Sequence, residues 1–467
     1  MASTPEARVH LPADLSVATL ERLYAARRLM PRDLIAALLE RIGTGRPDWI
    51  FVTPREDALA ACARLEARRA AAERLPLYGI PFGVKDNIDV AGMPTTAACP
   101  AFAYMPVRSA RSVELLEQAG AICLGKTNLD QFATGLSGVR SPYGACGSVG
   151  NPLYVSGGSS SGSAVAVAAG HVSFALGTDT GGSGRIPAGF NGVVGVKPTI
   201  GRVSTRGLVP NCPTLDCVSI FASTVDDGAR VLEIMEGFDH DDPFSRVPPG
   251  GASALASAFR FGVLHASDRE WFGMPECAAL YDAACERLAD LGGTPNVIDF
   301  APFREAGRML FDGPWIAERR AVLSPFVDDH RADLLDVTRT VLDSAKRYDA
   351  SATFTGLHRL LALRRLVERQ FASIDVMVVP TAPRPFTLAE MQADPIRLNN
   401  QLGHYSYFAN LLDLCGIALP NGALACGVPM GVTLLAPAWS DERLAAIARR
   451  FEAARLEDAR PRVAAHA

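Results

Sequence analysis

The sequence has few of the features that mark secreted, metal-binding or membrane-spanning proteins. Its ten cysteines are scattered and none forms a Cys-x-x-Cys pair, which argues against a zinc ribbon and a redox dithiol. The first residues lack the basic and apolar stretches of a secretory signal, and no apolar run approaches the length that spans a bilayer. We therefore predict a cytoplasmic protein that does not bind membranes and whose reduced cysteines act as small hydrophobic residues.

Net charge and histidine are also scarce. A formal charge of −4 gives no electrostatic reason to expect binding to nucleic acid or to an anionic membrane. Only eight histidines occur, and none sits in a Gly-x-Ser-x-Gly elbow, so a Ser-His-Asp triad has weak support. His171 lies close to two glycine-serine loops, and there we expect a structural, hydrogen-bonded histidine.

The chain has 467 residues, of which 48% are hydrophobic, and can bury a large core. No linker divides it, so we predict a single domain over residues 1–467. Its parts are an N-terminal helical region, a catalytic core, a helical region on the substrate side and a loose tail, over about 16–73, 79–235, 302–371 and 457–467.

Strand-turn-helix units in the core predict the fold class. Strands are expected at 79–84, 121–125 and 172–176, and an alanine-rich helix at 161–169 follows a glycine-serine loop. The order of these units predicts an α/β protein with a large mixed β-sheet core that helices cover on both faces.

Two serines on glycine-framed turns and one lysine carry the chemistry. Ser159 lies in Gly-Gly-Ser-Ser-Ser-Gly-Ser, Ser183 in Gly-Thr-Asp-Thr-Gly-Gly-Ser-Gly-Arg, and Lys85 at the end of an apolar segment. A serine hydroxyl needs a base to become a nucleophile. Lysine serves as that base only when neutral, and burial favours its neutral form. The set indicates a hydrolase that attacks an amide-like carbonyl.

The glycines before Ser183 offer a second function. Gly181 and Gly182 permit close approach of the backbone, so the turn from Thr180 onward can direct several N–H groups at a developing oxyanion. Asp179 and Arg185 flank the turn, and we expect them to pair and hold it rather than to act in catalysis.

Jointly, the segments around Lys85, Ser159 and Ser183 resemble the amidase signature family, as do the segments 125–128, 141–144 and 195–199. The similarity runs from about residue 15 to 451. It implies an amidase-signature fold without metal or organic cofactor. Its catalytic set would be Ser183 as nucleophile, Ser159 as a bridging serine with a cis peptide bond, Lys85 as base, and Thr180, Gly181, Gly182 and the Ser183 N–H as the oxyanion hole.

Further segments resemble the allophanate hydrolases within that family, at 130–136, 215–222, 237–239, 313–319 and 410–414. This resemblance implies an enzyme that hydrolyses allophanate, a small carboxylated urea, and releases ammonia. Arg319 would bind the substrate carboxylate, since a guanidinium suits that group, and Gly135 and Phe311 would border the substrate. It also implies a homodimer and a urea-carboxylating enzyme that supplies the substrate.

The sequence departs from that pattern in three respects. Phe311 stands where these hydrolases carry a tyrosine, which removes a hydroxyl that would contact the substrate. Gly181 replaces an expected alanine, with little expected effect on the oxyanion hole. The C-terminal domain that these hydrolases commonly carry is not expected within this chain.

Three alternatives remain open. Phe311 also fits an amidase or carbamate hydrolase for a less polar substrate. The family also includes the amidase component of tRNA-dependent transamidation complexes, although the segments around Cys217 and Trp315 count against it. Outside the enzymes, the glycine-serine loop is also compatible with a phosphate-binding protein, but the sequence lacks Gly-x-x-x-x-Gly-Lys-Ser/Thr.

Overall fold

A single mixed sheet runs through the computed structural model, which describes residues 11–249 and 258–458, so that most of the predicted loose tail lies outside the described residues. The strands are β1 (Trp49–Val52), β2 (Pro81–Lys85), β3 (Ile122–Thr127), β4 (Phe174–Asp179), β5 (Val194–Lys197), β6 (Cys217–Ala222), β7 (Phe259–Leu264), β8 (Gly293–Ile298), β9 (Val376–Pro380), β10 (Leu414–Ala423) and β11 (Pro429–Pro437). Their order across the 11-stranded sheet is β1-β3-β2-β4-β6-β5-β10-β11-β9-β7-β8.

The pairing of neighbouring strands changes three times across the sheet, which begins with the antiparallel pair β1 and β3. β2 lies parallel to both β3 and β4, whereas β4, β6, β5, β10, β11 and β9 are antiparallel to their successive neighbours. β9, β7 and β8 are parallel again. Every residue of β2, β3, β4 and β6 is buried, as expected for strands covered on both faces. The predicted mixed α/β sheet is confirmed.

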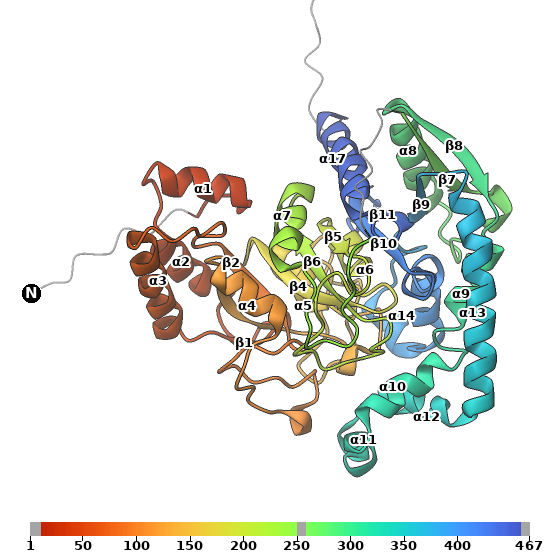
Figure 1. The fold of residues 1–467 in the computed structure, drawn as a ribbon, viewed down its shortest axis with the longest axis horizontal. Helices are drawn as coiled ribbons and strands as arrows, with labels where there is room; N and C mark the ends of the chain where they lie inside the picture. The colour runs from red at the N-terminus through yellow and green to blue at the C-terminus, as the bar shows by residue number, and fades with distance from the viewer. Residues whose placement is uncertain (1–10, 250–257, 459–467) are drawn as a thin grey trace, which may run out of the picture.

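Helices cover the sheet on both sides (Figure 1). They are α1 (Val17–Ala25), α2 (Pro31–Ile42), α3 (Arg55–Ala70), α4 (Arg111–Gln118), α5 (Ser161–Ala168), α6 (Ile186–Asn191), α7 (Val225–Met235), α8 (Cys277–Asp290), α9 (Ala301–Arg308), α10 (Trp315–Leu323), α11 (Phe326–Asp329), α12 (Asp336–Asp343), α13 (Ala350–Phe371), α14 (Leu388–Ala393), α15 (Arg397–Leu402), α16 (Phe408–Leu411) and α17 (Asp441–Asp458). None of these helices in the described ranges is long and apolar enough to cross a membrane.

Neighbouring residues of β5 show which helix covers which face. Side chains alternate between the two faces of a strand. A Cβ placed on Gly195 would lie 2.7 Å from the Cβ of Ala188 in α6, whereas the side chain of Val196 lies against Gly228 in α7. α6 and α7 therefore lie on opposite faces of the sheet.

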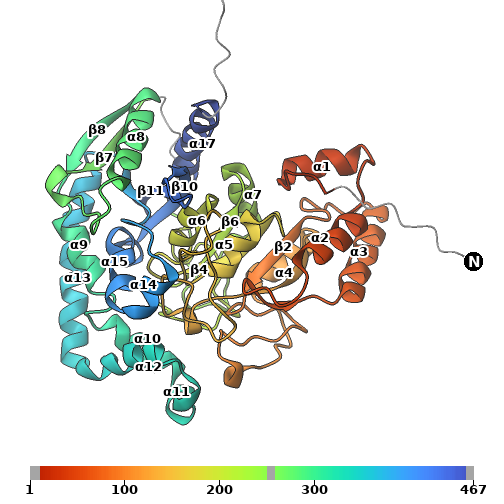
Figure 2. The same ribbon diagram turned by 180° about the vertical axis from the view of Figure 1, so that it is seen from behind.

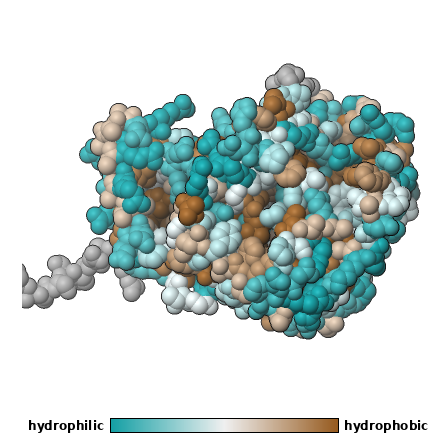
Figure 3. All heavy atoms as spheres, turned by 60° about the horizontal axis from the view of Figure 1, so that its bottom comes forward, coloured by the Kyte–Doolittle hydropathy of each residue, from teal (hydrophilic) through white to brown (hydrophobic). Residues whose placement is uncertain are grey.

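The chain starts at one end of the sheet, reaches the other end at β7 and β8, and returns through β9 to β10 and β11 in the middle (Figures 1 and 2). α1 to α3 lie at the end where β1, β3 and β2 run, and α8 and α13 lie at the end of β7 and β8. On the face drawn in Figure 3, hydrophilic residues dominate the rim and hydrophobic residues show through in the middle.

All ten cysteines are free, and eight of them are buried, as expected for reduced thiols in a core.

Candidate active site

Two parallel strands end side by side at the site. Lys85 is the last residue of β2, and Thr178 lies near the end of β4, its neighbour in the sheet. Lys85 Nζ lies 2.8 Å from Ser159 Oγ and 2.7 Å from Thr178 Oγ1. The lysine and Ser159 are both fully buried, so the contact between them is shielded from bulk water.

Ser159 is held in the loop that leads into α5. The peptide bond between Gly158 and Ser159 is cis. The Ser159 carbonyl accepts a hydrogen bond of 3.1 Å from the Asp130 N–H. The next residue, Ser160, donates its hydroxyl to the Thr178 carbonyl at 3.1 Å and accepts from the Thr178 N–H at 3.2 Å. These bonds fix the start of α5 against the end of β4.

Burial sets the charge of Lys85. Removal of the ammonium from water lowers the pKa of Lys85 to about 7, although the charges of Asp130, Asp216 and Asp179 act in the opposite direction. A lysine with such a pKa is partly neutral near pH 7 and can accept a proton.

Ser183 lies in the turn between β4 and α6, which Asp179 organises. The Asp179 carboxylate accepts from the N–H groups of Gly182 at 2.8 Å and Gly184 at 3.0 Å. Arg185 binds both carboxylate oxygens, at 2.9 and 3.0 Å. Burial raises the pKa of Asp179, but Arg185, Lys197 and the Gly182 N–H together outweigh it, so that this pKa is lowered. The predicted structural pair of Asp179 and Arg185 is confirmed.

The turn leaves particular N–H groups unpaired. Because Gly182 donates its N–H to Asp179, that group is engaged within the turn. The N–H groups of Thr180, Gly181 and Ser183, and the Ser183 hydroxyl, make no hydrogen bond to any residue that the structure describes. Three of the four backbone donors expected from the sequence are therefore available to a ligand.

Gly182 is required by its backbone conformation, whereas a Cβ at Gly181 would need the flexible end of the Leu310 side chain to move. Gly182 has φ 137°, a conformation that favours glycine. A Cβ on Gly181 would collide with Leu310 Cδ2 and lie 3.2 Å from Tyr407 Cδ1. The glycine at 181 is thus matched to Leu310 and Tyr407, a dependence that the sequence did not reveal.

Arg319 is a buried arginine whose guanidinium has one nitrogen without a hydrogen-bond partner. Only 2% of its surface is exposed, which excludes a role as a surface charge. Its Nε donates to Asn211 Oδ1 at 2.9 Å, and its Cζ lies 4.6 Å from the centre of the Phe311 ring. Arg319 Nη1 is buried without a hydrogen-bond partner. The phenyl ring of Phe311 lies 5.0 Å from that of Tyr407.

Gly135 lies in the loop from 130 to 140, which packs against the Ser159 loop. A Cβ on Gly135 would lie 2.5 Å from Asp130 Oδ2. The next residue, Leu136, accepts from the Gly158 N–H at 2.8 Å and donates to Asn399 Oδ1 at 2.7 Å. These contacts give Gly135 a packing function beside the site.

Sequence reasoning assigned no function to Asp216, Asn211 and Thr178. Asp216 belongs to a segment that carries the family resemblance, but a motif does not show which neighbours a side chain meets.

His171 contacts Asp48 and Trp49 and, within the described ranges, neither of the two serines. It is the structural histidine that the sequence predicted.

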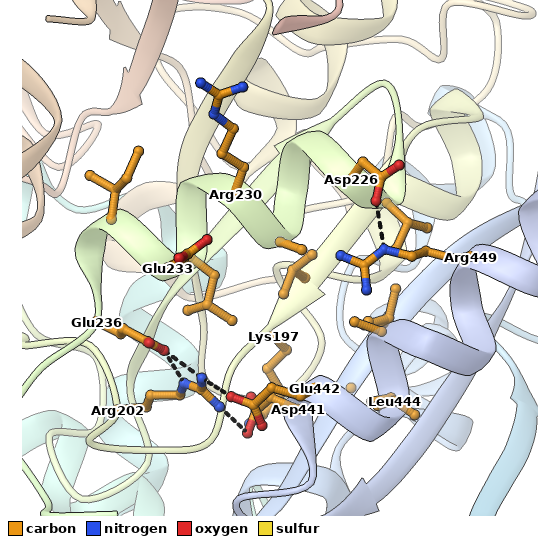
Figure 4. Close-up of a pocket in the computed structure, with 18 of the residues that line it drawn as sticks. Lys197, Arg202, Asp226, Arg230, Glu233, Glu236, Asp441, Glu442, Leu444 and Arg449 are labelled. Atoms are coloured by element: carbon orange, nitrogen blue, oxygen red, sulfur yellow. Dashed lines mark hydrogen bonds and ion pairs between the residues drawn. The ribbon is translucent and has the colours of Figure 1, made fainter. Parts of the chain in front are cut away.

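Two cavities lie in different parts of the molecule. One, of about 510 Å³, borders Phe311 and Tyr407 and is also lined by Arg304, Arg308 and Arg397. The other, of about 760 Å³, lies between α7, α17 and the sheet, where Arg202 pairs with Glu236, Asp441 and Glu442 (Figure 4). Only the first adjoins the turn that carries Ser183, through Tyr407.

Comparison with known sequences identifies relatives along most of the chain. A family model described as Amidase matches residues 33–445. The chain is 42% identical over 425 residues to the urea amidolyase of Saccharomyces cerevisiae, and the match covers 90% of this chain but 23% of that protein. It is 35% identical over 449 residues to a glutamyl-tRNA(Gln) amidotransferase component of Synechococcus sp. strain RCC307, covering 89% and 92% of the two chains.

Solved structures agree with these relatives. The allophanate hydrolase of Kluyveromyces lactis matches with a TM-score of 0.89 and 39% identity, covering 94% of this chain and 72% of that one. The peptide amidase of Stenotrophomonas maltophilia matches with a TM-score of 0.79 and 29% identity, covering 94% and 97%. The family match, the sheet and the turn around Ser183 agree, and this chain belongs to the amidase family.

Proposed function

We propose that this protein hydrolyses a small carboxylated urea or amide, with allophanate as the leading candidate, and releases ammonia. The hydrogen bond of 2.8 Å between Lys85 Nζ and Ser159 Oγ carries the proposal. It joins a hydroxyl to a lysine whose pKa burial lowers to about 7. Such a lysine can accept a proton through Ser159 and return it later.

In the first half of the reaction, Ser183 Oγ attacks the carbonyl carbon. This step requires Ser183 Oγ to meet Ser159 Oγ when substrate binds, because no hydrogen bond joins these two hydroxyls in the described structure. The proton of Ser183 then passes to Ser159 Oγ, while the proton of Ser159 passes to Lys85 Nζ. The carbonyl π electrons move to oxygen, and the unpaired N–H groups of Thr180, Gly181 and Ser183 stabilise that oxyanion. When the carbonyl re-forms, the C–N bond breaks and the leaving nitrogen takes a proton from Lys85 through Ser159.

In the second half, water hydrolyses the ester on Ser183. Lys85 and Ser159 accept the proton of the attacking water, and the oxyanion forms in the same place. Collapse of the intermediate breaks the bond to Ser183 Oγ, which regains a proton from Ser159. The enzyme returns to its starting protonation state, as a catalytic cycle requires.

The environment of Arg319 supports the proposal that the substrate is anionic. A buried guanidinium with an unpaired nitrogen costs free energy unless a ligand satisfies it, and a carboxylate fits it in both charge and shape. The relatives named urea amidolyase and allophanate hydrolase agree with this substrate class. The chain spans under a quarter of that urea amidolyase, 23%, so the activity of the whole protein is not transferred to it.

A less polar amide or carbamate is the second candidate, because Phe311 presents a ring where a hydroxyl is expected. A third candidate is an amidase component that works with partner chains. It is supported by the similarity to glutamyl-tRNA(Gln) amidotransferases. Activity of the isolated chain on free amides separates this third candidate from the other two. We also propose a cytoplasmic homodimer that receives its substrate from a urea-carboxylating enzyme.

An ammonia-release screen of small ureas, amides and carbamates tests the proposal. Wild type is compared with Ser183→Ala and with Ser112→Ala, a matched control in α4 whose buried hydroxyl has no hydrogen-bond partner. We expect turnover of allophanate by wild type and by Ser112→Ala, and a loss of at least about 10⁴-fold in Ser183→Ala. Full activity of the folded Ser183→Ala protein excludes the proposed nucleophile.

A further inference from the structure

Two buried polar residues connect the turn of Thr180 with Arg319. Asp216 is 3% exposed and accepts a hydrogen bond from the Thr180 hydroxyl on one oxygen. Its other oxygen accepts from the N–H groups of Asn211 at 2.7 Å and Cys212 at 3.1 Å. A carboxylate with three donors holds both segments in one geometry.

Asn211 continues this connection to Arg319. Its Oδ1 accepts from Arg319 Nε at 2.9 Å, and its Nδ2 donates to the Phe132 carbonyl at 2.9 Å. Arginine offers only donors and a carbonyl only accepts, so the amide has one possible orientation. We call Thr180, Asp216, Asn211 and Arg319, joined in this order, the buried bridge.

The buried bridge decides which edge of Arg319 is left for a ligand. A guanidinium binds a carboxylate through two parallel N–H groups. Nε is occupied by Asn211, and Nη2 lies 3.9 Å from Cys212 Sγ, a weak acceptor. Nη1 has no partner. The edge formed by Nη1 and Nη2 is therefore the one that a carboxylate can use.

We propose that Asn211 and Asp216 are positioning residues that fix this edge of Arg319 relative to the oxyanion-binding turn. The distance between the oxyanion-binding turn and the Nη1–Nη2 edge of Arg319 is then fixed. It selects amides that carry a carboxylate at one particular spacing from the scissile carbonyl. This inference rests on the proposed function, and it adds a basis for selection by substrate length.

Binding to the Ser183→Ala protein tests the inference without turnover. Calorimetry measures three probes: malonamate, its neutral analogue malonamide, and succinamate, which is one methylene longer. We expect malonamate to bind at least about tenfold more weakly to the variant that also carries Asn211→Ala or Asn211→Asp, because Arg319 loses its orientation or gains a competing carboxylate. Malonamide binding should stay unchanged, and the preference for malonamate over succinamate should shrink.

Asn421→Ala is the matched control. Asn421 is also a buried asparagine whose Oδ1 accepts from an arginine, Arg287, at 2.9 Å, but in β10 and away from the turn of Thr180. It should leave all three affinities unchanged. Asp216→Asn tests the other end, and its expected result is the same loss of preference for malonamate, with the melting temperature of each variant confirming a folded protein.

The possible outcomes separate the two proposals. If Arg319→Gln leaves malonamate binding unchanged, or if neither amide binds, the proposed substrate class is wrong and the inference fails with it. If Arg319→Gln weakens malonamate binding but the Asn211 variants behave like Asn421→Ala, the buried bridge does not position Arg319. If an Asn211 variant does not fold, Asp216→Asn decides between these outcomes by the same three affinities.

Discussion

Lys85 Nζ and Ser159 Oγ lie 2.8 Å apart, and both side chains are fully buried. Three carboxylates, those of Asp130, Asp216 and Asp179, act electrostatically on the lysine. They are too few to compensate for its removal from water, so its pKa falls to about 7. The contact therefore joins a hydroxyl to an amine that exchanges protons near physiological pH.

The first prediction concerns the pH dependence of activity. Lys85 acts as a base only when neutral, so kcat/KM should fall below about pH 7 by roughly tenfold per pH unit. Burial raises the pKa of Asp216 to about 6, and its protonation should steepen the fall at lower pH. Steady-state kinetics between pH 5 and 9 measure this profile. A rate that stays constant down to pH 5 contradicts a neutral Lys85 as base.

The second prediction concerns stability. Between pH 7 and about 10.4, the value for an unfolded lysine, Lys85 is neutral when folded but protonated when unfolded. The unfolded state then binds more protons, so this residue makes stability rise with pH across that window. The loss of unfolding free energy caused by the buried Lys85, roughly 5 kcal/mol, is complete below pH 7. Lys85→Met removes it.

Urea unfolding of wild type and Lys85→Met at pH 7 and pH 9.5 measures this effect. The unfolding free energy of the variant relative to wild type should be greater at pH 7 than at pH 9.5. The same difference at both values means that Lys85 titrates normally in the folded protein. Lys85→Met should also be inactive, which links the stability penalty to function.

The third prediction concerns the ion pair that holds the Ser183 turn. Asp179 and Arg185 are both fully buried, and Asp179→Asn leaves a buried guanidinium without its counter-charge. We expect a loss of about 3–5 kcal/mol in unfolding free energy, measured by urea denaturation. Glu305→Gln, which affects an exposed pair with Arg359, is the control and should change stability little. Equal effects of the two variants contradict the structural importance of the buried pair.

The fourth prediction concerns the substrate. Phe311→Tyr places a hydroxyl beside Arg319, whose Cζ lies 4.6 Å from the centre of the present ring. If the substrate is carboxylated, kcat/KM for allophanate should rise by about tenfold, as expected for a hydrogen bond to a charged group. Simple aliphatic amides are the control and should not gain. An unchanged rate with allophanate means that position 311 does not contact the substrate.

Much of the core could be predicted from the sequence because its signals are local. The apolar segments at 79–84, 121–125 and 172–176 became β2, β3 and β4, each within a few residues of the expected range. Burial on both faces of a strand requires a continuous apolar run, which is visible in a single sequence. The alanine-rich segment after the glycine-serine loop likewise became α5.

Pairings between distant segments were not accessible in the same way. β6 pairs with both β4 and β5, and although its segment is apolar, it was not among the strands expected from the sequence, nor were these pairings. The Thr180 hydroxyl meets Asp216, and Arg319 meets Asn211, 108 positions away. Hydrogen bonds of this kind depend on how the sheet and helices bring segments together, and neither residue type nor local spacing encodes them.

The residue types and glycine-framed turns of the sequence determined which groups could do chemistry here: two hydroxyls, one lysine and a backbone rich in donors. Tertiary structure alone decided that Lys85 loses its water and approaches Ser159, that Gly182 directs its N–H to Asp179, and that Arg319 keeps one nitrogen free. The reason is physical: a side chain's identity sets which protons and charges it can carry, whereas its pKa and its partners depend on what surrounds it.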